Sequence, residues 1–178
     1  MNYQDLCNAF SKNRQSWSAY RHEVYQVFFT MHSALLKKLN LPKDEEEKLV
    51  TIMPADETKV NAGTKYTVPG AVDFNSEGWA NFGFKITLRQ GPNIFPQQAY
   101  SFIFWLRKRK DSWIFKTFVN GSEFDLGKAP DEKSFDAPFD ELLRFLCEGL
   151  EMGLENCLND IDTNKNTPIG FKISEVSK

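Results

Sequence analysis

The stretch "WANFGFKITLR", residues 79–89, decides the fold class because its apolar and polar side chains alternate strictly. The even positions hold Ala, Phe, Phe, Ile and Leu, and the odd positions hold Trp, Asn, Gly, Lys, Thr and Arg. Successive side chains of a β-strand point to opposite faces of the sheet. The alternation therefore predicts a strand with one buried face.

Antiparallel neighbours are expected on the C-terminal side of this strand. Residues 100–107 continue the alternation, and "WIFKTFV", residues 113–119, repeats it. The polar link "KRKDS", residues 108–112, has the length of a hairpin connection. The Asn-Gly pair at 120–121 readily adopts the positive φ angles of a tight turn, and a short fourth strand can follow it. Residues 79–126 are therefore predicted to form an antiparallel β-meander.

Helical periodicity flanks the predicted sheet on both sides. Apolar residues recur at steps of three and four over 17–39, which predicts a long helix that ends before Pro42. A shorter helix is expected ahead of it over 3–10, and another short one over 42–50. The longest helical pattern covers 136–162 near the C-terminus.

The order of these segments predicts a single α+β domain. A chain of 178 residues suits one domain. We expect an antiparallel sheet of about four or five strands, flanked by a long N-terminal and a long C-terminal helix. In chain order the helical region, the loop-rich region, the meander, the C-terminal helix and a polar tail occupy 1–50, 51–78, 79–126, 136–162 and 163–178.

Charge and cysteine content restrict the class of protein. The net charge is −2, from 22 basic and 24 acidic residues, whereas dedicated nucleic-acid binders are usually strongly basic. The cysteines, Cys7, Cys147 and Cys157, are odd in number and lack CxxC spacing, which argues against a zinc site or a disulfide framework. The N-terminus has no secretory signal pattern, and no apolar run is long enough to span a membrane. We expect a cytoplasmic protein with no membrane partner.

No motif in the sequence indicates catalysis or metal binding. His22 and His32 are the only histidines, and they do not form a metal-binding pair such as HExxH. The D-x-D-x-N-x-N series over 160–166 resembles the start of a calcium loop. That loop requires Gly and Glu where this chain has Lys165 and Phe171. We therefore predict no catalytic residue, no cofactor and no metal.

The candidate binding surface combines the sheet face opposite the phenylalanines with the cationic turn at 107–110. Trp and Arg are enriched among the hot spots of protein interfaces. Cations interleaved with flat rings also suit single-stranded nucleic acid. Alternatively, helices cover this face, its rings belong to the core, and the charged turn is only hydrated. The predicted binding residues are Trp79, Lys85, Arg89, Trp105, Arg107, Lys108, Arg109 and Lys110.

Three functions are compatible with these features. The first is a small non-enzymatic protein, a monomer or homodimer, that binds another protein as an adaptor, an inhibitor or an immunity-type protein. The second is a nucleic-acid-binding module that uses the same face, which the net charge disfavours. The third is an enzyme or ligand-binding protein with a pocket between sheet and helices that uses Asp73, Glu77 or His22.

Overall fold

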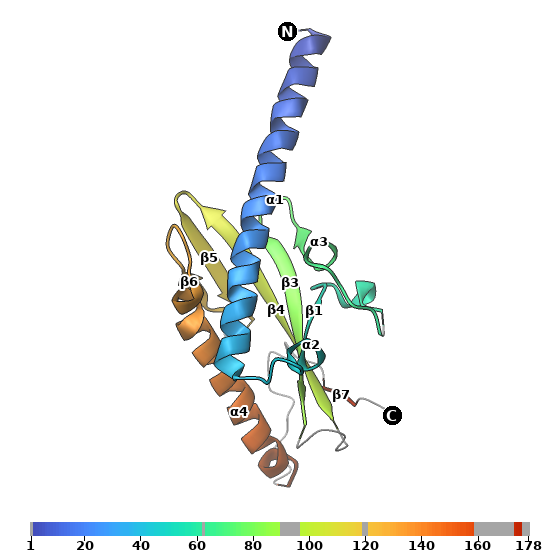
Figure 1. The fold of residues 1–178 in the computed structure, drawn as a ribbon, viewed down its shortest axis with the longest axis vertical. Coiled ribbons are helices and arrows are strands. Elements are labelled where there is room, and N and C mark those ends of the chain that lie inside the picture. Colours follow the sequence, from blue (N-terminus) through green and yellow to red (C-terminus); the bar gives the residue numbers. More distant parts are fainter. Residues whose placement is uncertain (1, 62, 90–96, 119–120, 159–172, 176–178) are drawn as a thin grey trace.

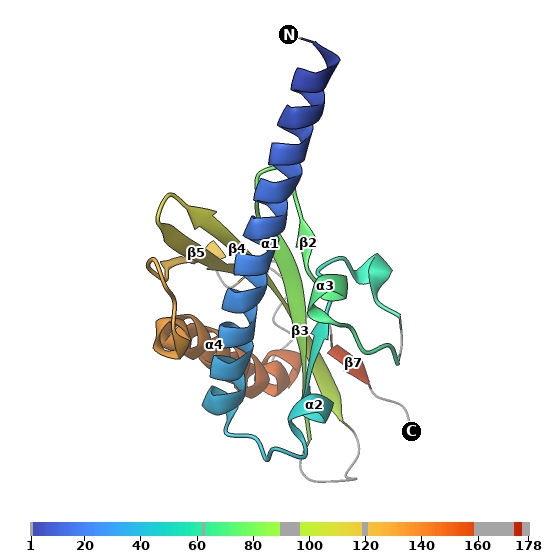
Figure 2. The same cartoon turned by 45° about the horizontal axis from the view of Figure 1, so that its top comes forward.

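The fold is a twisted antiparallel sheet with two long helices on one face. The computed structural model describes residues 2–61, 63–89, 97–118, 121–158 and 173–175. Helix α1 (Tyr3–Leu39) and helix α4 (Asp136–Leu158) lie side by side over the sheet in both views (Figures 1 and 2). The predicted α+β class and the predicted placement of the long helices are confirmed.

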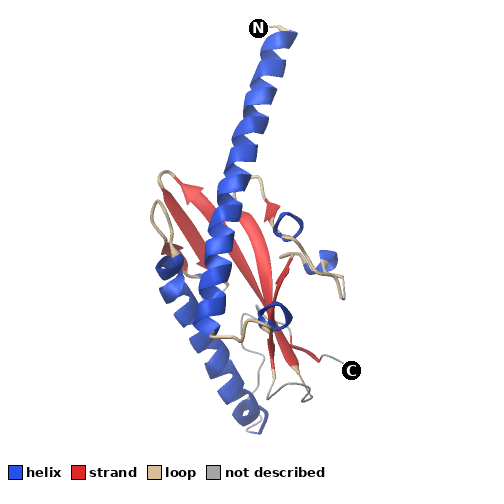
Figure 3. Cartoon of the chain, viewed as in Figure 1, coloured by secondary structure: helices blue, strands red, loops and turns tan. Residues whose placement is uncertain are grey.

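The sheet contains seven strands in the described part of the chain, and every pairing is antiparallel (Figure 3). The strand order is β1-β3-β4-β5-β6, with β2 also paired to β3 and β7 also paired to β4. Consecutive strands from β3 to β6 are neighbours, as expected for a meander. The strands are β1 (Val50–Met53), β2 (Asp73–Phe74), β3 (Ala80–Leu88), β4 (Gln98–Arg109), β5 (Ser112–Thr117), β6 (Glu123–Asp125) and β7 (Ile173–Glu175).

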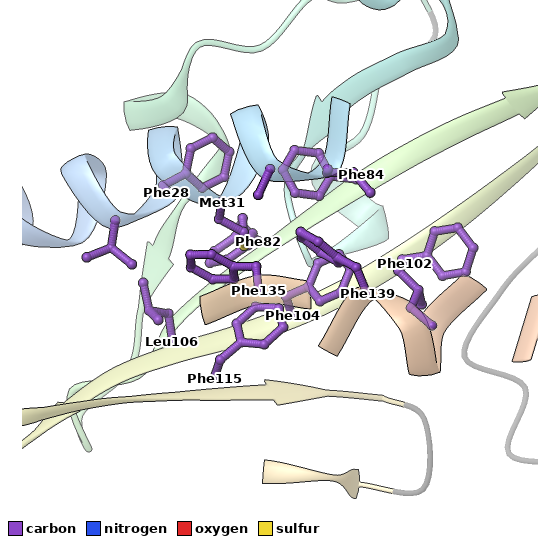
Figure 4. Packing of buried hydrophobic residues seen from close by; sticks show 14 of the residues in the cluster. Phe28, Met31, Phe82, Phe84, Phe102, Phe104, Leu106, Phe115, Phe135 and Phe139 are labelled. Carbon is purple, nitrogen blue, oxygen red and sulfur yellow. The ribbon is translucent and has the colours of Figure 1, made fainter. Parts of the chain in front are cut away.

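The register places the phenylalanines of neighbouring strands on one face, which we call the inner face. Phe82 lies opposite Phe104, and Phe84 lies opposite Phe102. Directly opposed residues share a face of an antiparallel pair, so these rings form a continuous apolar layer. The two long helices cover this layer, as Figure 4 shows for the rings that meet between helix and sheet.

Both long helices insert aromatic rings into the inner face. The Phe28 ring of α1 lies 5.0 Å from the Phe82 ring, centroid to centroid. The Phe139 ring of α4 lies 6.4 Å from the Phe115 ring of β5, in an edge-to-face arrangement. Each fully buried phenylalanine contributes about 1.5–3 kcal/mol relative to an exposed one. The core therefore fixes α1 and α4 to the same side of the sheet.

Helix α1 is continuous, whereas the sequence predicted two helices joined by an uncertain polar link. Residues 11–16 contain no Gly or Pro, so nothing in them interrupts the hydrogen-bond ladder. Asn2 and Asp5 form a reciprocal capping box at the start of the helix. Asn40 ends it with a φ of 49°. The N-terminal part of α1 runs past the end of the sheet (Figure 1).

Other shorter predictions either differ from the structure or lie outside the described residues. Within 42–50 only α2 (Glu46–Leu49) is an α-helix, because Pro42 leads into a turn and the β-branched run from Val50 pairs with β3. The expected polar tail contributes β7 to the sheet edge beside β4. The helical pattern beyond Leu158 and the calcium-like series lie outside the described residues. The loop-rich region holds two short helices, η1 (Glu57–Lys59) and α3 (Val68–Ala71), and η3 (Glu132–Phe135) precedes α4.

Candidate functional site

The candidate site begins with the outer face of the sheet, which is the face opposite the phenylalanine core. Trp105 lies opposite Asn81 in β3 and Lys116 in β5, and Arg107 lies opposite Ile114 in β5. Strand alternation points these side chains away from both long helices. The sequence predicted an aromatic and cationic face opposite the phenylalanines. The phenylalanine side of the sheet packs against the long helices, so the opposite face is the one that carries these residues.

One end of the outer face joins a tryptophan to an arginine. The guanidinium carbon of Arg107 lies 4.3 Å from the centroid of the Trp79 ring. Trp79, Trp105 and Arg107 are all partly exposed. The Nε of Arg107 is buried and has no hydrogen-bond partner within the described part of the chain. A cation over an indole face is a favourable pair, so this contact orients both side chains.

Lys108 occupies a different place from the one the sequence suggested. It lies opposite Trp113 on the inner face, because strand β4 continues through Arg109. Its Nζ lies 2.5 Å from the carboxylate Oε2 of Glu23 on α1. Its backbone N–H donates to the Tyr20 hydroxyl. Lys108 therefore connects the β4–β5 hairpin to α1. Trp113 is buried on this same inner face, as is Phe115.

Of the other predicted cations, Arg109 lies beside Arg107. It is two residues further along β4 on the same outer face, as Trp105 is in the other direction, and it is exposed. Lys110 is exposed in the hairpin turn, where it adopts a φ of 56°. Arg89 forms an ion pair with Glu45, and its side chain is only 15% exposed. Lys85 lies six residues from the position opposite Arg107 along the strand direction, or about 20 Å. The structure thus groups Trp79, Trp105, Arg107 and Arg109 and separates Lys85, Arg89 and Lys108 from them.

Acidic partners break up the positive charge of the sheet. The Nζ of Lys116 lies 3.9 Å from the Oε1 of Glu123. Lys108 and Arg89 are paired with carboxylates as described above. A nucleic-acid surface needs free cations in a row for successive phosphates. Among the described residues Lys85, Arg107, Arg109 and Lys110 form no ion pair, so the unpaired cations of the sheet are Lys85 and these three residues at the hairpin.

The side chains considered for a pocket lie in separate environments. Asp73 forms an ion pair with Lys59 at 2.6 Å. Glu77 is exposed in the turn before β3. His22 is exposed on α1 and lies within hydrogen-bonding distance of Gln26. None of the three lines the cleft of about 810 Å³ beside β1. The proposed catalytic grouping of these residues is not present.

The strongest surface feature, an apolar stripe on the projecting part of α1, was not predicted as a site. The stripe consists of Tyr3, Leu6, Phe10 and Trp17, which recur at steps of three, four and seven and so share one side of the helix. Tyr3 is 81% exposed, Leu6 is 57% exposed and Phe10 is 66% exposed. A buried helix face would have the same spacing of apolar residues. The spacing alone therefore could not show that this stripe is exposed.

A shallow hollow of about 450 Å³ lies where the stripe reaches the sheet. Asn13, Ser16, Trp17, Tyr20 and Gly78 line it. The Tyr20 hydroxyl donates a 2.7 Å hydrogen bond to the Gly78 carbonyl, and burial raises the pKa of Tyr20. This hydrogen bond therefore holds Tyr20 against Gly78, and the two residues form one side of the hollow.

No protein-family model, no curated protein and no solved structure matches the chain. Among the described helices, none combines the length and the apolar character needed to cross a membrane. The described residues also contain no group of three or more His, Cys, Asp or Glu side chains placed to hold a metal ion. Geometry is therefore the basis for a functional proposal.

Proposed function

We propose that this protein is a non-enzymatic binding protein whose partner is another protein, and that the apolar stripe of α1 is the main contact surface. The observation that carries the proposal is the exposure of Tyr3, Leu6 and Phe10 in one row. Scattered apolar residues are normal on a surface, whereas a contiguous row of large ones is typical of an interaction site.

The stripe belongs to a helix that is already formed before a partner arrives. Its capping box stabilises the first turn, and its C-terminal half is held in the core by residues such as Phe28 and Leu35. Most of the stability of a helix in a protein comes from the packing of its apolar face rather than from helix propensity. Continuity with the packed half removes much of the ordering cost of binding. A preformed amphipathic helix fits an apolar groove on a partner.

The end of the outer face near Trp79 is proposed as a second contact surface. Trp79, Trp105 and Arg107 combine large rings with a cation that the stacking contact holds in place. Tryptophan and arginine contribute disproportionately to binding energy when a partner excludes water from them. An adaptor, an inhibitor or an immunity-type protein would each use surfaces of this kind.

Site-specific photo-crosslinking in the source cells tests the proposal. Benzoylphenylalanine placed at Phe10 should give a discrete protein adduct that nuclease treatment does not remove. The matched control places the same group at Gln15, which lies about 140° around the helix from Phe10. Gln15 is equally part of the projecting segment but lies on its polar side, so it should give no such adduct.

A pair of triple variants separates binding from folding. Tyr3→Ser/Leu6→Ser/Phe10→Ser removes most of the stripe, and Asn8→Ala/Lys12→Ala/Gln15→Ala removes polar side chains from the opposite side. Both variants should keep the thermal unfolding temperature of the parent, because the substituted residues are exposed. Only the first should lose the captured partner, by at least about tenfold. Adducts that contain nucleic acid, or equal capture by both variants, would contradict the proposal.

A further inference from the structure

Strand β1 leaves one of its edges unpaired. It is the terminal strand of the sheet order, and β3 is its only strand neighbour among the described residues. The Val50 N–H donates to the Glu46 carbonyl of α2. Within the described residues no backbone hydrogen bond occupies the other groups of β1 that point away from β3, and the loop at 60–66 faces this edge across a cleft. The edge lies at the side of the sheet next to α2 (Figure 1).

A cleft of about 810 Å³ surrounds this edge and reaches both faces of the sheet. On the inner face it is lined by His32, Leu36 and Ile52. On the outer face it is lined by Lys85 and Ser101, which lie opposite each other in β3 and β4. The volume is within the range of about 300–1,000 Å³ typical of ligand sites. The cleft therefore has an inner branch and an outer branch, separated by β1.

The two branches differ in chemistry. The inner branch holds the apolar Leu36 and Ile52 and the His32 ring, which is stacked 5.5 Å from the Phe84 ring. Glu46 and Glu47 of α2 also line the cleft; Glu47 is paired with Lys65 of the loop at 60–66, and Glu46 lies near His32. The Nε2 of His32 is buried and has no hydrogen-bond partner within the residues described. The outer branch contains Lys85, for which no ion pair or hydrogen bond occurs in the described part of the chain. Lys108 and Lys116, in contrast, each have a carboxylate partner.

We infer that the free edge of β1 binds an extended acidic peptide as an additional strand. Side chains of an extended peptide alternate between the two faces of a sheet. One side chain can therefore enter the outer branch while its neighbours enter the inner branch. A carboxylate in the outer branch would pair with the Lys85 amine, and apolar neighbours would pack near Leu36 and Ile52. Strand addition of this kind takes affinity from the main chain and specificity from alternating pockets. The site is separate from the apolar stripe of α1.

Two pools of six-residue peptides, acetylated and amidated at their ends, test this inference on the full chain. Both pools alternate Val, Ile or Leu with a charged residue, which is Asp or Glu in one pool and Lys or Arg in the other. Amide chemical shifts of the isotope-labelled protein report the site. The acidic pool should shift the amides of Val50–Met53 and bind at least about tenfold more tightly than the basic pool.

Substitutions at the outer branch assign the charge contact. Lys85→Met should weaken binding of the acidic pool about tenfold, because the peptide carboxylate loses a charged hydrogen-bond donor. Lys85→Arg keeps the charge and should retain binding, which also shows that the site tolerates substitution. Lys116→Met, on the same sheet face but away from the cleft, should leave binding unchanged.

Several outcomes would overturn the inference. The acidic pool could fail to bind at millimolar concentration, or it could bind without shifting the β1 amides. Binding that is insensitive to Lys85→Met would remove the charge assignment. Acidic peptides methylated on alternate backbone nitrogens cannot complete a strand ladder, so undiminished binding of these peptides would exclude strand addition. If free succinate then showed the same dependence on Lys85, the cleft would be a site for small dicarboxylates instead.

Discussion

The guanidinium carbon of Arg107 lies 4.3 Å above the centroid of the Trp79 ring, so a side chain of β4 is stacked on the residue that precedes β3. The contact lies at one end of the outer face, away from both long helices. It connects neighbouring strands through side chains in addition to the backbone ladder. We expect it to stabilise the fold measurably.

Double substitution measures the strength of this contact. Arg107→Met and Trp79→Leu each remove one partner, and their combined effect on the free energy of unfolding should differ from the sum by about 0.5–1 kcal/mol. Urea titration followed by circular dichroism provides the four values. Arg109→Met serves as the control cation, because Arg109 is exposed at the hairpin and should not couple to Trp79. Strict additivity of the Arg107 and Trp79 substitutions would contradict the prediction.

Tyr20 joins α1 to two separate parts of the sheet layer. Its hydroxyl donates to the Gly78 carbonyl, and its ring is stacked on Trp113 with centroids 6.2 Å apart. Tyr20→Phe keeps the ring and removes both the hydrogen bond to Gly78 and the longer one from the Lys108 N–H, so the free energy of unfolding should fall by about 1 kcal/mol or more. Chemical denaturation measures the change. Tyr3→Phe, at an exposed position on the same helix, should have no effect. Equal stabilities of Tyr20→Phe and the parent would show that water replaces the lost bond at no cost.

The stability of the protein should depend on the protonation of His32. Burial lowers the pKa of His32, and the nearby Glu46 carboxylate opposes this effect only in part. The unfolded chain therefore binds a proton more readily than the folded chain. Because proton binding is linked to unfolding, the free energy of unfolding should fall as the pH decreases below about 6.5, the ordinary pKa of histidine.

His32→Phe isolates this contribution because it keeps an aromatic ring beside Phe84. Between about pH 7 and about pH 5 the parent should lose more unfolding free energy than His32→Phe does. Urea titrations at several pH values measure both curves. His22→Phe removes the exposed histidine of the same helix and should keep the parental pH dependence. Parallel curves for the parent and His32→Phe would contradict the prediction.

Local patterns predicted the strands well because side-chain alternation is a property of the strand itself. The alternation over 79–89 correctly separated the buried Phe82 and Phe84 from the partly exposed Lys85. The same rule explains the error at Lys108. Lys108 was predicted to lie in a turn. Strand β4 instead continues through Arg109, so side-chain alternation directs Lys108 toward Glu23 on α1. Strand length depends on pairing with β5, which a single strand does not encode.

The formation of β1 also depends on pairing with residues that are distant in the sequence. The run at 50–53 follows a charged helical pattern and has only four residues, so periodicity could not identify it. Its extended conformation is supported by the β3 ladder, in which Thr51 lies opposite Lys85. The cleft around this edge forms where α1, α2, the loop at 60–66 and the sheet meet.

The sequence by itself determined the α+β class, the meander and the side of each strand that is apolar, because these follow from side-chain periods of two and of three to four residues. Only the tertiary structure decided which apolar faces are covered. Phe10 and Phe28 occupy the same helix and follow similar spacing, yet Phe10 is 66% exposed and Phe28 is fully buried. The reason is that burial depends on how far the sheet extends along α1, and the N-terminal part of that helix continues beyond it (Figure 1).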